Sequence, residues 1–184
     1  MAGVRLLADK GISAWLIEKP ADPSKAVAEE INAGQQIACV VGTDFTIGSG
    51  APNTTEDGPL CSGLGNQIPT SKTLEATISA LRFFDKNTKQ IHVESDFFFQ
   101  AVKEFGTEFW IAVRDGGKDP RIAPDVVEGD EVSIYHLISG GAGRAADRAG
   151  YQKRQIHATV ADAYEDLWVD GTAPVPSGSG GSGE

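Results

Sequence analysis

The sequence predicts an α+β domain that is mainly β: a β-sandwich or barrel-like sheet with one main α-helix packed on it. Two patterns predict this class. Residues 74–80 alternate apolar and polar side chains, which is typical of a strand with one buried face. Residues 96–105 carry apolar side chains at helical spacing. At 184 residues, the chain has the length of one domain, which we place over residues 1–172.

The first 45 residues predict an arm, a connector and a strand. Residues 1–16 offer apolar contacts as an N-terminal arm or an edge strand. Residues 17–33 form a connector with a helical turn near residues 25–32. Residues 35–45 are rich in Ile, Val and Ala, which favours a strand.

Residues 46–71 are dense in Gly, Pro, Asn, Thr and Ser and predict a long loop. Loops of this length in a compact domain have a function or are disordered, and the sequence leaves both interpretations open.

The next strand spans residues 72–85 and has one polar and one apolar face. The apolar face holds Leu74, Ala76, Ile78 and Ala80. The polar face holds Thr73, Glu75, Thr77 and Ser79.

A helix follows over residues 96–105, with Ser95 or Asp96 as its N-cap and Gly106 as its left-handed stop. We expect its apolar stripe to pack on the sheet; the stripe consists of Phe98, Ala101, Val102 and Phe105.

The remaining residues predict more strands and a mobile end. Strands are expected over residues 107–114, 130–139 and 153–162, with residues 164–169 extending the last strand or leaving it. Residues 140–150 suggest a Gly-rich turn, and residues 173–184 a flexible Gly/Ser-rich tail.

The sequence lacks the residue patterns that nucleotide binding, metal binding and catalysis require. Gly140 begins a Gly-rich stretch without the Gly-Lys-Ser/Thr ending of a phosphate-binding loop. Cys39 and Cys61 have no paired-ligand spacing and suggest buried thiols rather than a disulfide. We expect no catalytic site, cofactor or metal, and no membrane insertion, since no apolar run reaches 18 residues.

The charge balance is acidic and uneven. The formal net charge is −10 at pH 7, and no Lys or Arg follows Gln155. DNA-gripping proteins neutralise phosphates with basic patches, so this balance excludes that mode of binding. The late carboxylates predict a solvated acidic face rather than a cation site, which would need a closing bidentate Glu: Asp162, Glu165, Asp166 and Asp170.

Residues 72–115 resemble the tail tube (major tail) proteins of long-tailed siphophages, most closely the actinobacteriophage branch. The resemblance rests on TLEATISALRFFD, followed by a short helix that ends in KEFGTEFWIAVRDG. IEKPADPSKAVAEEINAGQQI at residues 17–37 is similar to the opening of that branch, and VEGDEVSIY and QIHATV agree with its rear part. The resemblance covers about residues 4–170 and rests on the order of weak motifs.

The resemblance implies a structural protein of the virion tail, assembled in the host cytoplasm. It implies six-fold rings that stack into a hollow tube for DNA ejection, with tape-measure, tail terminator and distal tail proteins as partners. It also implies that the long loop reaches the neighbouring ring; the candidate contact residues are Thr46, Asn53, Glu56, Asp57 and Leu60.

A tube that conducts DNA needs a wall to which phosphates do not adhere, and hydroxyls and carboxylates provide one. The candidate lumen-facing residues are Thr73, Glu75, Thr77, Ser79, His157 and Thr159. Plain solvent exposure of these side chains is the alternative interpretation. For the whole chain, the alternative is another virion structural protein of related fold, such as a tail terminator, head–tail connector or decoration protein.

Overall fold

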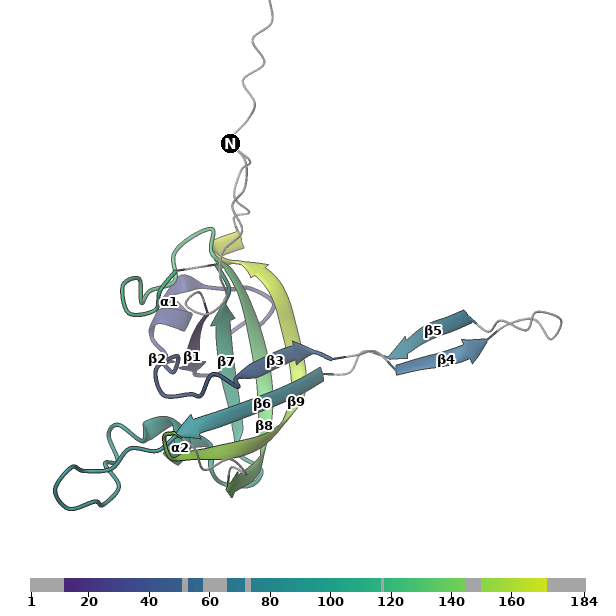
Figure 1. Cartoon of the computed structure of the whole chain (residues 1–184). Coiled ribbons are helices and arrows are strands. Elements are labelled where there is room, and N and C mark those ends of the chain that lie inside the picture. Colours follow the sequence, from purple (N-terminus) through teal and green to yellow (C-terminus); the bar gives the residue numbers. More distant parts are fainter. Residues whose placement is uncertain are drawn as a thin grey trace, which may run out of the picture. The chain divides into compact units, whose positions relative to one another are not determined.

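The computed structural model describes residues 12–50, 53–57, 66–71, 74–116, 118–144 and 150–171 (Figure 1). These residues fall into two compact units, and each is described by itself. Unit 1 takes its residues from Met1–Cys39, Phe109–Tyr135 and Tyr164–Glu184. Unit 2 takes its residues from Val40–Glu108 and His136–Ala163.

The described part of the chain is mainly β, as predicted. Seven strands form one antiparallel sheet in the order β2-β1-β7-β8-β9-β6-β3, and β4 pairs with β5 separately. The strands are β1 (Ser13–Ile17), β2 (Gln35–Gln36), β3 (Thr46–Ser49), β4 (Asn53–Asp57), β5 (Asn66–Ser71), β6 (Leu74–Leu81), β7 (Glu108–Arg114), β8 (Glu131–Arg144) and β9 (Lys153–Trp168). The helices are α1 (Ala28–Asn32), α2 (Phe97–Val102) and a final 3-10 turn, η2 (Val169–Gly171).

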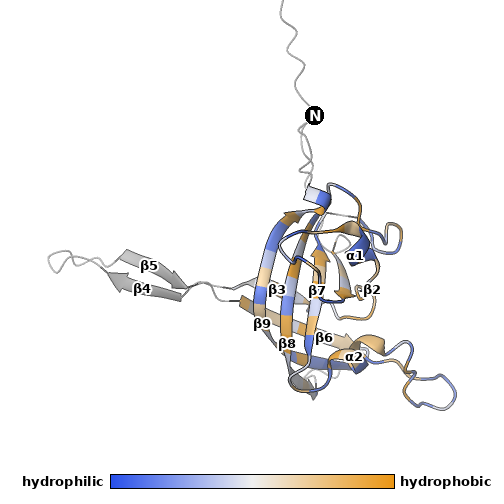
Figure 2. Ribbon diagram, turned by 180° about the vertical axis from the view of Figure 1, so that it is seen from behind, coloured by the Kyte–Doolittle hydropathy of each residue, from blue (hydrophilic) through white to orange (hydrophobic). Residues whose placement is uncertain are grey.

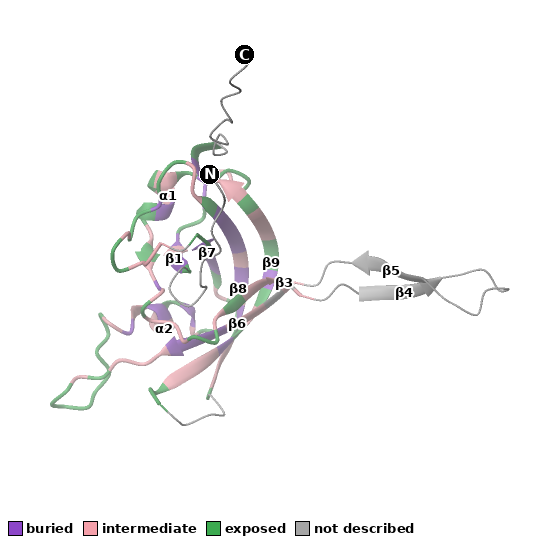
Figure 3. Ribbon diagram, turned by 45° about the horizontal axis from the view of Figure 1, so that its top comes forward, coloured by how far each residue is buried: buried purple, intermediate pink, exposed green. Residues whose placement is uncertain are grey.

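Unit 1 has its core where β1 and β7 meet α1. β1 pairs antiparallel with β7, and every residue of β7 after Glu108 is buried, so this strand has no solvent face (Figure 3). A buried cluster includes Trp15, Ile31, Trp110 and Val132. Strands that are covered on both faces are apolar throughout, which explains the run FWIAV in β7.

Unit 2 contains the two-faced strand that the sequence predicts. Ile78 and Ala80 of β6 are fully buried, and Ile78 lies opposite Ile156 of β9 in register. α2 packs against β6 through Phe98 and Val102, which are also buried. Along β9, hydrophilic and hydrophobic residues alternate in the same manner (Figure 2). The predicted helix on one face of a sheet is therefore confirmed.

The predicted helix is shorter than expected. α2 ends at Val102, so Phe105 lies beyond it and is 85% exposed, and Ala101 faces solvent. The buried Ser139 hydroxyl donates a hydrogen bond to the Val102 carbonyl oxygen at 2.7 Å and occupies the acceptor at this helix end. Gly106 has φ +80°, the left-handed stop conformation expected of it.

The predicted strand over residues 35–45 is wrong beyond Gln36. Residues 38–40 form a turn, and Val41 makes only an isolated bridge to Ala80. Cys39 lies in this turn and is exposed, so its expected burial is also wrong. β1 lies between β2 and β7, so residues 13–16 are not an edge strand.

Two segments predicted as irregular contain strands. Residues 46–71 include β3 in the main sheet and the paired β4 and β5, so they are not one long loop. β8 continues through Gly140 to Arg144, and β9 runs unbroken from Lys153 to Trp168. A Cβ at Gly140 would lie 3.0 Å from the His157 carbonyl oxygen, so this glycine marks close strand packing and not a turn.

Several sequence predictions lie outside the described residues. These are residues 1–11 of the expected arm, Leu60, Cys61, Thr73 and the expected flexible tail over 173–184.

Candidate functional surfaces

Three polar residues form a row across adjacent strands of unit 2. Thr77 of β6 lies opposite Thr46 of β3 on one side and opposite His157 of β9 on the other. Directly opposed residues of antiparallel strands share one face of the sheet. Thr46 and His157 are exposed and Thr77 is half-buried, so the row reaches the surface of the unit. We name Thr46, Thr77 and His157 the polar row.

Thr159 lies two residues beyond His157, on the same face of β9, and is exposed. The predicted polar faces of β6 and β9 are thus brought together by strand pairing, because β9 is the neighbour of β6. For Glu75, the backbone pairs with Gly48 of β3, and its side chain lies outside the described part of the structure.

Ser79 occupies the same face of β6 but is buried in the single chain. Its hydroxyl donates to Asp44 Oδ2 at 2.7 Å, and Lys153 Nζ lies 3.6 Å from the same oxygen. Partial burial opposes ionisation of Asp44, but the Ser79 and Lys153 contacts outweigh it and hold the pKa of Asp44 below its ordinary value. Lys153, the cation on this face of β9, therefore has a carboxylate partner in Asp44.

The imidazole ring of His157 packs closely against Gly143. A Cβ on Gly143 would lie 2.9 Å from His157 Nε2, so only a residue without a side chain leaves room for the imidazole in its present position. This role of Gly143 was not predicted, because the Gly-rich pattern of residues 140–150 is typical of a turn.

β4 and β5 form a separate two-stranded element that contains most of the predicted inter-ring residues. Glu56 pairs with Gln67 and Asp57 with Asn66, and the register shifts between Asn53 and Thr54. The predicted contact residues Asn53, Glu56 and Asp57 thus lie on one strand, whereas Thr46 belongs to the main sheet.

The carboxylates of β9 have different environments. In unit 2, Asp162 Oδ2 lies 3.6 Å from Nδ1 of His136, whose Nε2 lies 3.4 Å from Glu108. In unit 1, the Tyr135 hydroxyl donates to Glu165 at 3.3 Å, and burial raises the pKa of Tyr135 to about 12. Among the described residues, no group of three or more His, Cys, Asp or Glu is placed to hold a metal ion.

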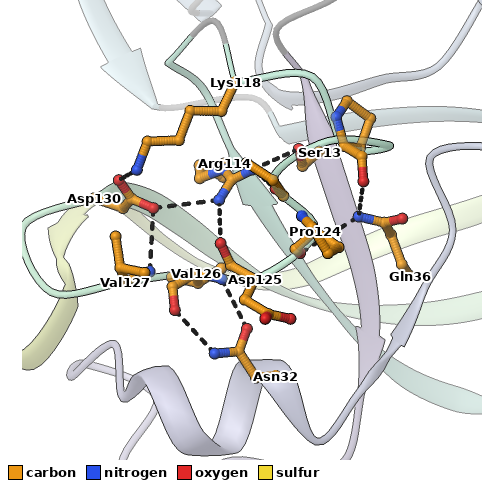
Figure 4. A network of polar contacts seen from close by, with 12 residues as sticks. Ser13, Asn32, Gln36, Arg114, Lys118, Pro124, Asp125, Val126, Val127 and Asp130 are labelled. Atoms are coloured by element: carbon orange, nitrogen blue, oxygen red, sulfur yellow. Dashed lines mark hydrogen bonds and ion pairs between the residues drawn. The ribbon is translucent and has the colours of Figure 1, made fainter.

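A buried arginine organises the loops of unit 1 (Figure 4). Arg114 is 1% exposed and donates to the carbonyl oxygens of Ala123 and Asp125 at 2.8 and 2.6 Å. It also donates to Ser13 Oγ at 3.1 Å and pairs with Asp130 at 3.3 Å, and Asp130 in turn accepts a hydrogen bond from Lys118. This network fixes residues 118–130 on the core, which is a structural role.

These features describe a β-sheet structural protein: a two-faced antiparallel sheet with a polar row, and edge strands β2 and β3 in its described part. The family model for phage tail tube protein matches residues 1–169. The chain belongs to this family, and the resemblance to tail tube proteins is confirmed. No curated protein matches the chain. None of the described helices is long and apolar enough to cross a membrane.

Proposed function

We propose that this chain is the repeating subunit of a siphophage tail tube, in which six-fold rings stack into a hollow tube that conducts the DNA genome into the host. The observation that carries the proposal is the family match over residues 1–169. The role is structural and non-enzymatic. Tape-measure, tail terminator and distal tail proteins are its proposed partners, the host cytoplasm is its site of assembly, and the actinobacteriophage branch is its proposed lineage.

The polar row supports a place for this sheet face on the bore. Its side chains are two hydroxyls and one imidazole, and Lys153, farther along the face, is paired with Asp44. A wall of this composition offers DNA no unpaired cation, so phosphates gain no counterion release by adhering to it. We propose that Thr77, His157 and Thr159 face the lumen, together with Thr73 and Glu75, whereas Ser79, which the sequence predicted at this wall, is buried and bonded to Asp44.

Ser79 fits this assignment as a supporting residue. Because the buried Ser79 hydroxyl donates to the exposed Asp44, the surface at this position consists of Asp44 rather than Ser79. The proposed wall therefore includes a carboxylate that the sequence analysis did not consider.

The sheet edges and the β4–β5 element are the proposed contacts between subunits. Edge strands carry unpaired backbone donors and acceptors, and closing a ring removes such edges. We propose that the β4–β5 element contacts the next ring through Asn53, Glu56, Asp57 and Leu60, and that Thr46 of β3, the N-terminal arm and the C-terminal segment contribute.

Electron microscopy of the purified chain tests the proposal. We expect hollow tubes of stacked six-fold rings after concentration or seeding with a tail initiator complex. Isolated rings or cages without stacking would favour a terminator or decoration protein. A protein that stays monomeric under all of these conditions would contradict the proposed function.

A further inference from the structure

A hydrogen-bonded loop between β6 and α2 presents apolar side chains to solvent. Phe84, Ile91 and Val93 are 41%, 45% and 65% exposed, although Phe84 and Ile91 face each other in a bridge. We name residues 83–95 the bridge loop. Exposed apolar side chains gathered on one loop are typical of a protein contact.

The bridge loop is held in shape by its own hydrogen bonds. The Asp85 and His92 backbone N–H groups donate to Gln90 and Phe83 carbonyl oxygens at 2.8 and 3.0 Å. At its base, the carboxylate of Asp96 accepts a hydrogen bond from the Phe83 backbone N–H at 3.2 Å. A loop that is already ordered loses little conformational entropy on binding, which favours a docking role.

The tip of the bridge loop is basic. Lys86 and Lys89 are exposed, and Asp85 directs its carboxylate back to the N–H groups of Asn87 and Thr88 at 2.9 and 2.7 Å. The loop therefore combines an apolar side with two outward ammonium groups.

Unit 1 contains a groove of complementary character, with a volume of about 540 Å³. Val27, Leu167 and Trp168 supply apolar walls, and Asp166 and Asp170 supply carboxylates. The lysine in the groove, Lys25, pairs with Asp22 at 3.1 Å, and Asp170 accepts a hydrogen bond from the Ala28 backbone N–H, so Asp166 is the carboxylate on which we base the complementarity. We name this the β9-end groove.

We propose that the bridge loop of one copy docks into the β9-end groove of the next copy. Phe84, Ile91 and Val93 would cover the apolar walls, and Lys89 would approach Asp166. Because loop and groove are different surfaces of the chain, the contact is heterologous and propagates from subunit to subunit. This inference rests on the proposed function, since it names one contact of the proposed assembly.

Disulfide trapping between copies tests the contact directly. In a Cys39→Ser/Cys61→Ser background, Lys89→Cys and Val27→Cys are introduced together, and ¹⁴N- and ¹⁵N-labelled proteins are mixed before assembly. We expect mixed-isotope cross-links in assembled material and none for Glu104→Cys with Val27→Cys, because Glu104 lies outside the bridge loop. Cross-links confined to one isotope would place the loop on its own chain and overturn the proposal.

A second test measures how substitutions at the proposed contact change the critical concentration for assembly. Phe84→Ser should raise it by about tenfold or more, as loss of an apolar anchor does. Lys89→Gln and Asp166→Asn should each raise it by about two- to fivefold, as expected of a partly exposed ion pair, and the double variant should add nothing to either single change.

The outcomes separate this inference from the proposed function. Tubes that form at the wild-type concentration in every variant, without cross-links, would overturn the docking contact and leave the tube assignment standing. A wild-type chain that never associates would contradict both.

Discussion

Arg82 and Asp96 form a buried, two-pronged ion pair that joins the end of β6 to the start of α2. Arg82 Nε lies 2.8 Å from Asp96 Oδ1, and Arg82 Nη2 lies 3.0 Å from Asp96 Oδ2. The same carboxylate accepts hydrogen bonds from Gln100 Nε2 at 2.7 Å and from the Phe83 N–H, and the guanidinium lies 3.9 Å from the Phe99 ring centroid. Asp96 thus stands at the N-cap position of α2, as predicted, but its side chain caps no helical N–H.

Asp96→Asn should destabilise the protein by about 3–5 kcal/mol, because it leaves a buried guanidinium without its counter-charge. The measurement is the free energy of unfolding in urea. Asp22→Asn is the matched control, since its pair with Lys25 is exposed, and it should leave the free energy of unfolding nearly unchanged. Equal effects of the two substitutions would contradict a structural role of the buried pair.

Acid should destabilise the protein through this same carboxylate. Burial opposes ionisation, but the hydrogen bonds from Arg82, Gln100 and Phe83 outweigh it and hold the pKa of Asp96 below the ordinary 3.8. A lowered folded-state pKa contributes stability that is present above the unfolded-state pKa and is lost as pH falls through the folded-state value. The free energy of unfolding should therefore drop below about pH 4.

The Asp96→Asn variant isolates this effect. Its free energy of unfolding should depend less steeply on pH than the wild type below that point. An unchanged slope would assign the acid sensitivity to other carboxylates, such as Asp44 and Asp130, whose pKa values are also lowered despite partial burial.

Arg114→Met should cost about 3–5 kcal/mol, because the substitution leaves the buried carbonyl oxygens of Ala123 and Asp125 without this donor and removes one of the two cations that pair with Asp130. Arg121→Met removes a pair with Asp119 that involves an exposed arginine, and it should leave stability nearly unchanged. Thermal unfolding of both variants checks the difference. If Arg114→Met were as stable as the wild type, the buried network would not be what fixes residues 118–130.

Gly34→Ala should destabilise unit 1 by about 1–3 kcal/mol through overpacking. A Cβ there would lie 2.7 Å from both Ile17 Cγ2 and the Leu16 carbonyl oxygen, and the backbone cannot move away cheaply. Ala33→Ser, an exposed neighbour, should change stability by less than about 0.5 kcal/mol. Urea unfolding of the two variants side by side gives the comparison.

If the proposed six-fold tube and lumen assignment hold, Glu75→Lys and Thr77→Lys should leave tube assembly intact but lower infectivity, because each proposed ring would place six new cations against the passing phosphates. Plating efficiency and the rate of DNA ejection from complemented particles measure this. Glu128→Lys makes the same charge change as Glu75→Lys in an exposed turn of unit 1. Normal infectivity for both β6 variants would refute the lumen assignment.

The sequence was most informative where structure depends on short-range periodicity. The burial of Ile78 and Ala80 in β6 follows from alternation, although Ser79 of the predicted polar face is buried as well. The burial of Phe98 and Val102 in α2 follows from helical spacing. The end of α2 was not predictable, because Ser139 contacts Val102 from 37 positions away. β4 and β5 were missed because their polar sequences NTTED and NQIPTS lack the apolar alternation of a half-buried strand.

The candidate surfaces show the same division. Thr77, His157 and Thr159 were selected from alternation, but their common face depends on β9 being the neighbour of β6, which is a matter of topology. The hydrogen-bond partners of Ser79 and Arg114 come from distant segments, so no local pattern in the sequence predicts these contacts.

The alternation along β6 also limits how a protein of this kind can diversify. Inserting a single residue before Ile78 would reverse the faces of the residues that follow it, so that Ile78 and Ala80 would turn to the polar face and Ser79 to the apolar face. Related sequences can therefore change this surface by substitution of single residues. Insertions and deletions are expected in the loops, where side chains do not have to alternate between two faces.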